Sequence, residues 1–105
     1  IGGVWMICSY PACFVKEEDG FSVVFPDLGN VATCGDTLEE AEFMATDLLA
    51  GYLSWLEEDG KEIPNPSKEE SVEVSDILNL LDIGETEAFV KMVSVDVEEY
   101  AKEHF

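Results

Sequence analysis

Arginine is absent from this sequence, and only five lysines stand against 24 aspartates and glutamates. The formal net charge of the 105 residues is therefore -19, and the sequence pI is about 4.1. Binding to phosphates needs Lys and Arg, and bidentate recognition of a guanine edge usually needs Arg. A chain this acidic repels nucleic acid and anionic membranes and attracts cations, chiefly basic proteins or metal ions. The composition excludes direct DNA or RNA binding by this span and predicts a basic protein as the partner.

Three other shortages exclude further classes of protein. The three cysteines, Cys8, Cys13 and Cys34, form no CxxC pair, so they indicate neither a disulfide framework nor a zinc site and are expected to be reduced. The only histidine, His104, stands one residue from the end, where no rigid shell is expected to orient it for nucleophilic catalysis. The glycines match no phosphate-binding loop. The sequence predicts no enzyme activity and no resident metal or cofactor.

Long apolar runs are also missing. No run approaches the ~18 residues of a membrane span, and residues 1–8 lack the basic flank of a signal peptide, which predicts a soluble, cytoplasmic protein. The hydrophobic content of 47% and the length favour one small folded domain over a disordered chain. Residues 1–5 precede a methionine and are interpreted as an extension ahead of an internal start or as added residues.

Hydropathy periods predict an α+β domain. Alternating strand formers predict an antiparallel meander over residues 6–15, 21–26 and 31–35, followed by a strand over 88–95. Apolar spacings of three and four predict a long helix over 37–59, capped by Thr37 with Glu40 or, alternatively, by Asp36. The predicted buried face of that helix is Leu38, Ala41, Ala45, Leu48, Tyr52 and Leu56. A short helix within 75–82 and a final helix over 97–105 complete the prediction. If the strands flanking the long helix are parallel, a right-handed crossover places the fourth strand against the first.

The final helix has barely two turns before the sequence stops. We expect residues 96–105 to lead into a further domain that these 105 residues do not include. Tyr100 and Phe105 are left without a following element to bury them. An antiparallel meander also leaves an edge strand available for pairing, so self-association is expected, with Tyr100 and Phe105 as the candidate oligomer interface.

Several blocks of sequence occur in an order that resembles the HicB antitoxin family. They are Tyr10-Pro11-Ala12, Glu17-Glu18-Asp19-Gly20, Phe21-Ser22-Val23, Phe25-Pro26-Asp27-Leu28 and Gly35-Asp36-Thr37-Leu38-Glu39-Glu40-Ala41. The resemblance spans nearly the whole chain, with departures at Gly29-Asn30 and over residues 69–87. It implies a β-β-β-α-β partial RNase H-like fold that binds and inhibits a small basic toxin, HicA, which cleaves messenger RNA. It also implies a C-terminal DNA-binding domain beyond this span, so promoter DNA is not expected to bind these residues alone.

Two surfaces compete as the toxin-binding site. The favoured surface combines the predicted β-turn, the loop after the second strand and the start of the long helix: Glu17, Glu18, Asp19, Asp27, Asp36 and Glu39. Residues on loops set on a rigid sheet often bind partners, and several of these lie in the blocks that carry the resemblance. The alternative surface is the far end of the helix at Glu57, Glu58 and Asp59.

Two other functions stay open at the level of sequence. A metal-dependent RNase H-like nuclease would need Asp27, Asp36 and Asp96 to converge on metal ions. A free-standing oligomeric interaction domain is the other alternative, favoured if the gene ends near Phe105.

Overall fold

The computed structural model describes residues 7–105, so the proposed extension at residues 1–5 lies outside the described residues. Four strands, β1 (Ile7–Glu17), β2 (Gly20–Phe25), β3 (Val31–Gly35) and β4 (Ala88–Asp96), form one sheet. The helices are α1 (Leu38–Glu58), α2 (Val74–Leu80) and α3 (Val97–His104), with two short 3-10 turns, η1 (Pro26–Leu28) and η2 (Glu69–Ser71). The predicted α+β element order is confirmed, with boundaries that differ by one or two residues.

The strand order is β3-β2-β1-β4, and every neighbouring pair is antiparallel. The fourth strand therefore lies against the first, the position that the sequence analysis gave for a parallel crossover. Since β1 is antiparallel to both β2 and β4, β3 runs in the direction of β1 and opposite to β4. The condition of parallel flanking strands is not met, and the handedness rule for parallel strands does not apply to this connection.

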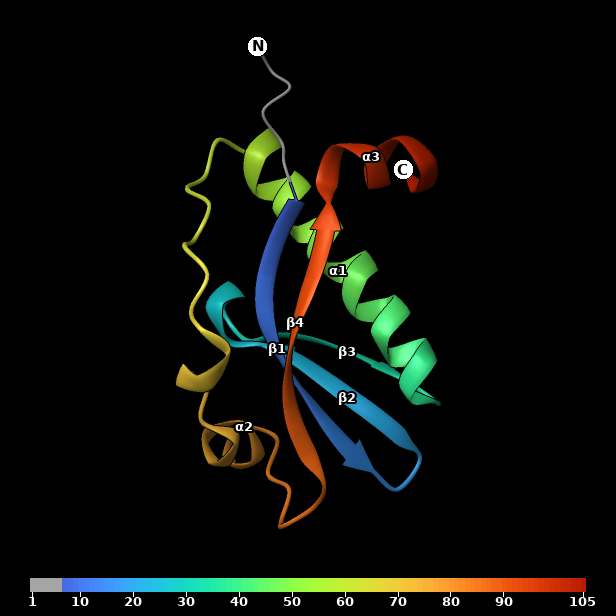
Figure 1. The fold of residues 1–105 in the computed structure, drawn as a ribbon, viewed down its shortest axis with the longest axis vertical. Coiled ribbons are helices and arrows are strands. Elements are labelled where there is room, and N and C mark those ends of the chain that lie inside the picture. The colour runs from blue at the N-terminus through green and yellow to red at the C-terminus, as the bar shows by residue number, and fades with distance from the viewer. Residues whose placement is uncertain (1–6) are drawn as a thin grey trace.

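One face of the sheet is covered by α1, which crosses it diagonally (Figure 1). The helix begins after Thr37, whose hydroxyl accepts a hydrogen bond from the backbone N–H of Glu40 at 3.1 Å. The predicted stripe is only partly buried, because Leu48 and Tyr52 are half-buried and Leu38 is exposed. The buried helix residues are Ala41, Ala45, Leu49, Ala50, Leu53 and Leu56.

The opposite face carries a second, smaller apolar layer that the sequence patterns did not reveal. Ile77 of α2 packs over Cys13, Val15 and Val24, all of which are buried. The segment from residue 61 to α2, called the strap (residues 61–73), begins on the α1 side, where Ile63 packs against the main core, and leads to α2 on the opposite side. The two apolar layers together bury the middle of β1 on both faces. Its residues from Tyr10 to Val15 are accordingly apolar without alternation.

The last helix, α3, packs against α1. Asp96 caps it by accepting a hydrogen bond from the backbone N–H of Glu99 at 3.0 Å. The phenol of Tyr100 donates a hydrogen bond to Asp47 of α1 at 2.8 Å. Across residues 7–105, none of the helices has the length and apolar character needed to span a membrane.

Candidate functional site

An acidic hollow lies at the end of the sheet where β1 turns into β2 and β3 leads into α1. Its volume is about 440 Å³. We call it the hairpin hollow; its lining residues are Glu17, Glu18, Asp19, Gly20, Phe21, Ser22, Cys34, Gly35 and Asp36. Four of the six predicted partner-binding residues, Glu17, Glu18, Asp19 and Asp36, meet here.

Two glycines allow this end of the structure to close tightly. Gly20 has φ +148°, and a Cβ atom built on it would lie 2.4 Å from the carbonyl oxygen of Gly35. A Cβ atom on Gly35 would lie 2.4 Å from the backbone nitrogen of Ala41 in α1. Because the obstructing atoms are backbone atoms, they cannot move aside as a flexible side chain would. The close approach brings the acidic turn and the start of α1 to the same place.

The start of α1 is held by two hydrogen bonds that resemble a capping box, except that the Glu40 carboxylate bonds to the residue before the N-cap Thr37. The Thr37 hydroxyl accepts from Glu40, and the Glu40 carboxylate accepts from the backbone N–H of Asp36 at 3.1 Å. Glu40 is thereby committed to the cap. The carboxylates of Asp36 and Glu39 remain on the exposed surface next to it, although Glu39 does not line the hollow.

The chemistry of the hairpin hollow suits a cationic side chain. Glu17 accepts a hydrogen bond from the hydroxyl of Ser22, which orients one carboxylate toward the hollow. The ammonium nitrogen (Nζ) of Lys16, which belongs to the same hairpin, lies 5.7 Å from the centre of the Phe21 ring. Phe21 is half-buried and supplies an apolar wall. Carboxylates beside an aromatic wall can accept the charged end of Lys or Arg and pack against its aliphatic stem.

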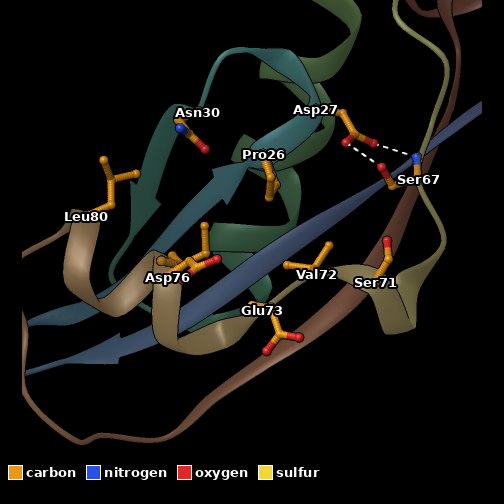
Figure 2. Close-up of a pocket in the computed structure, with 10 residues that line it drawn as sticks. Pro26, Asp27, Asn30, Ser67, Ser71, Val72, Glu73, Asp76 and Leu80 are labelled. Carbon is orange, nitrogen blue, oxygen red and sulfur yellow. Dashed lines mark hydrogen bonds between the residues drawn. The ribbon is translucent and has the colours of Figure 1, made fainter.

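Asp27 lies away from the hairpin hollow, which corrects the expectation that all six acidic residues form one surface. It follows β2 at the end opposite Gly20, because β2 runs from Gly20 to Phe25. Its two carboxylate oxygens accept hydrogen bonds from Ser67 of the strap, at 2.6 Å from the backbone N–H and 2.8 Å from the hydroxyl (Figure 2). The structure thus gives Asp27 a contact that holds the strap.

Asp27 also lines a second hollow, of about 340 Å³, between η1, the strap and α2 (Figure 2). The other lining residues are Pro26, Asn30, Ser67, Ser71, Val72, Glu73, Asp76, Ile77 and Leu80. Sequence reasoning missed this hollow because it joins segments more than 30 residues apart. The only local signal was Pro26-Asp27, a turn pair directly after a strand.

The three aspartates of the nuclease hypothesis do not converge. Asp96 pairs with Ile7 at the first residue of β1, whereas Asp36 follows Gly35, which lies across β2 from the last residues of β1. About nine strand positions separate these two levels, or roughly 30 Å at 3.3 Å per residue. Within residues 7–105 no group of three or more His, Cys, Asp or Glu side chains is arranged to hold a metal ion. A shared metal site at Asp27, Asp36 and Asp96 is therefore contradicted.

The alternative acidic surface is also hollowed. Glu57 and Glu58 lie beside Glu98 and Lys102 of α3 along a groove between α1 and α3. Asp59 forms an exposed ion pair with Lys61 at 3.7 Å. This surface carries a lysine among its acids, which lowers its local negative charge relative to the lining of the hairpin hollow.

The structure also places the cysteine, histidine and aromatic residues that the sequence analysis singled out. Burial raises the pKa of the Cys13 thiol, which favours the unreactive protonated form. The His104 ring stacks on Tyr100 with 4.2 Å between ring centres. Tyr100 itself is half-buried against α1, and Phe105 remains 62% exposed. Of the two residues predicted for an oligomer interface, only Phe105 presents a large apolar surface.

Comparison with known proteins gives one family. Residues 9–83 match a family model described as "HicB_like antitoxin of bacterial toxin-antitoxin system". "Antitoxin HicB 2" of Photorhabdus laumondii is 47% identical over 58 residues, which cover 55% of this chain and 42% of that protein. An "Uncharacterized 14.9 kDa protein in rep-hol intergenic region" of Haemophilus phage HP1 is 36% identical over 55 residues, covering 52% of this chain and 41% of that protein. The matched span is thus less than half the length of these curated relatives.

Solved structures share the fold. A chain of a "Toxin-Antitoxin complex from Streptococcus pneumoniae" superposes with a TM-score of 0.80 and 32% identity, covering 90% of this chain and 73% of that one. A chain of a "HicA3 and HicB3 toxin-antitoxin complex" superposes with a TM-score of 0.62 and 20% identity, covering 81% of this chain and 94% of that one. The second likeness concerns the fold alone.

Proposed function

The chain belongs to the HicB-like antitoxin family, and from this membership we propose that it binds and neutralises a basic, HicA-type, mRNA-cleaving toxin. The proposed activity is stoichiometric binding, not catalysis. The proposed place of action is the cytoplasm, where such a toxin meets mRNA.

The observation that supports the proposal most strongly is the likeness to the Streptococcus pneumoniae chain. It extends over 90% of this chain at 32% identity, so it concerns most of the fold rather than one motif. That chain comes from a toxin–antitoxin complex, and we carry a toxin partner over to this chain as a proposal.

The charge of the chain supplies the physical reason for this partner. A toxin that cleaves RNA must hold phosphates and therefore presents basic side chains. A protein with a net charge of -19 attracts that surface and competes with RNA for it. Steering of this kind raises the association rate, while lasting affinity needs a desolvated apolar centre.

We propose the hairpin hollow as the first contact for the toxin. Glu17, Glu18, Asp19 and Asp36 concentrate negative charge at one end of the sheet, with Phe21 as an apolar wall. Glu39 extends this acidic rim along α1. Asp27 is omitted from the proposed contact, because Ser67 occupies both of its carboxylate oxygens.

The test is calorimetry of the purified chain with the HicA-type toxin encoded beside it, together with an RNA-cleavage assay of that toxin. The expected result is a saturable interaction at low salt and loss of toxin-catalysed RNA cleavage at equimolar antitoxin. No heat and no inhibition at low salt would overturn the proposal. Magnesium-dependent RNA cleavage by the chain alone, lost on Asp→Asn replacement, would replace it with the nuclease alternative.

A further inference from the structure

The two edges of the sheet are built differently. The β3 edge is five residues long and lies between two structural constraints: the left-handed residues Gly29 and Asn30 before it, and Gly35, packed under α1, at its end. The β4 edge is nine residues long, and within residues 7–105 no strand pairs with its outer side. Proteins usually shorten, bend or cover an edge of this length, or use it for pairing.

The hydrogen-bond register identifies the backbone groups that point outward from β4. The N–H of Lys16 donates to the carbonyl of Glu87 at 2.9 Å, which continues the register in which Phe14 pairs with Phe89. In an antiparallel pair, alternate residues bond to the partner strand and the residues between them point away. Val90, Met92 and Ser94 therefore present their N–H and C=O groups to the outside.

This edge also lacks the acidic residues that fill most of the chain. Residues 88–95 contain no Asp or Glu, although 24 of the 105 residues are acidic. Lys91 lies at the middle of the strand, and its ammonium forms an ion pair with Glu42 of α1 at 3.0 Å. Residues 88–95 thus add no negative charge of their own to a contact at this edge, although the neighbouring η2 carries Glu69 and Glu70 and Asp96 ends the strand.

We propose that β4 pairs with β4 of a second copy of this chain, antiparallel and with Met92 on the two-fold axis, which joins two four-stranded sheets into one. In this register the outward groups of Met92 bond to those of its own counterpart, and Val90 bonds to Ser94. On the α1 face, Phe89, which is 39% exposed, comes to lie beside Val95 of the second copy. The interface is isologous, which means that the same surface of each copy contacts its counterpart on the other.

A second copy fits this edge better than a basic toxin does. A basic strand would find no carboxylate within residues 88–95, whereas the hairpin hollow offers several. The arrangement assigns the acidic end of the sheet to the toxin and the β4 edge, in which residues 88–95 contain no Asp or Glu, to self-association. The inference does not depend on the proposed toxin-binding activity.

The decisive experiment measures oligomeric state by sedimentation equilibrium over protein concentration and NaCl concentration. A dimer is expected, and its dissociation constant should fall as salt screens the repulsion between the two acidic chains. Met92→Glu places two carboxylates at the axis and should weaken the dimer at least tenfold. Ala32→Glu is the matched control, since it adds the same charge at an outward position of the β3 edge. At about 0.5 M NaCl the repulsion between the two acidic chains is strongly screened. A chain that stays monomeric there at millimolar concentration overturns the proposal.

Amide hydrogen exchange of the unaltered chain tests the register without any substitution. The N–H groups of Val90, Met92 and Ser94 should exchange more slowly as protein concentration rises, whereas those of Ala32 and Cys34 should not change. A dimer in which these three amides stay unprotected overturns the proposal and directs attention to another surface, such as Phe105. Protection that develops only when toxin is added overturns it in favour of a toxin strand at this edge.

Discussion

Ser67 donates two hydrogen bonds to Asp27, one to each carboxylate oxygen, across 40 residues of sequence. The two bonds fasten the strap to the end of β2, beside the small apolar layer under α2 (Figure 2). Because each bond has a charged acceptor, each is stronger than a neutral hydrogen bond. Asp27 therefore helps to hold the strap against the end of β2, next to the second apolar layer.

Asp27→Ala should lower the free energy of unfolding by about 2 kcal/mol, since hydrogen bonds to charged groups contribute about 1.5–3 kcal/mol and this pair is only partly buried. Urea unfolding followed by circular dichroism measures the change. Asp76→Ala removes the same charge from the same hollow and should cost less than about 1 kcal/mol. Equal losses in the two variants would show that charge, and not the bonds to Ser67, sets the effect.

The hairpin hollow can be tested by reversing its charge. Changing Glu17, Glu18 and Asp19 together to Lys should slow association with the toxin by about tenfold at low salt and flatten its salt dependence, with a smaller effect on dissociation. Stopped-flow fluorescence measures both rates.

The matched control reverses Glu57, Glu58 and Asp59, which changes the net charge by the same amount at the other end of α1. We expect it to retain most of the association rate. If this variant associates slowly while the hairpin variant keeps the parent's rate, the toxin binds at the far end of the helix.

Gly35→Ala should destabilise the fold by about 3 kcal/mol, because the added methyl group would overlap the backbone of Ala41 and push α1 away from the sheet. Thermal unfolding measures the loss. Gly84→Ala is the control, as a Cβ atom there meets nothing within 4 Å, and it should change the stability by less than about 1 kcal/mol. A Gly35→Ala protein as stable as the control would mean that α1 shifts without cost.

Tyr100 should make stability depend on pH in alkaline solution. Burial and the hydrogen bond to Asp47 raise the pKa of Tyr100 from 10 to about 12. Between these values the unfolded chain releases the phenol proton before the folded chain does, so the free energy of unfolding falls as pH rises from about 10 to about 12. Below pH 10 this contribution is fully present.

Tyr100→Phe removes both the proton and the hydrogen bond to Asp47. It should be less stable than the parent near neutral pH by about 1 kcal/mol, and the difference should shrink as pH rises toward 12. Urea unfolding at several pH values measures the difference. A difference that stays constant up to pH 12 would contradict the role given to the phenol.

Much of the fold could be predicted from local sequence. The hairpin at residues 17–20 follows from polar turn residues between two runs of strand formers, and the start of α1 follows from Thr37 and Glu40, three residues apart. These features depend on contacts between near neighbours, so the pattern of residues and the structure agree. The placement of β4 against β1 was predicted only for strands β3 and β4 that run parallel, and that condition is not met, because periodicity carries no information on strand direction.

The candidate site was predicted in part for the same reason. Glu17, Glu18 and Asp19 are adjacent in the chain, and any hairpin places them together. That Asp36 joins them, and that Asp27 does not, depends on the direction of β2, since these residues flank opposite ends of the same pair of strands. Sequence reasoning grouped them because both follow strands.

The sequence by itself determined the charge of this protein, the class of partner that such a charge attracts, and the family to which its motifs belong. Charge is a sum over residues and needs no structure. The tertiary structure alone decided which carboxylates gather at the hairpin hollow and which hold the fold, and which strands form the two edges of the sheet. These outcomes depend on contacts between segments tens of residues apart, such as Asp27 with Ser67 and Lys91 with Glu42, which no local pattern encodes.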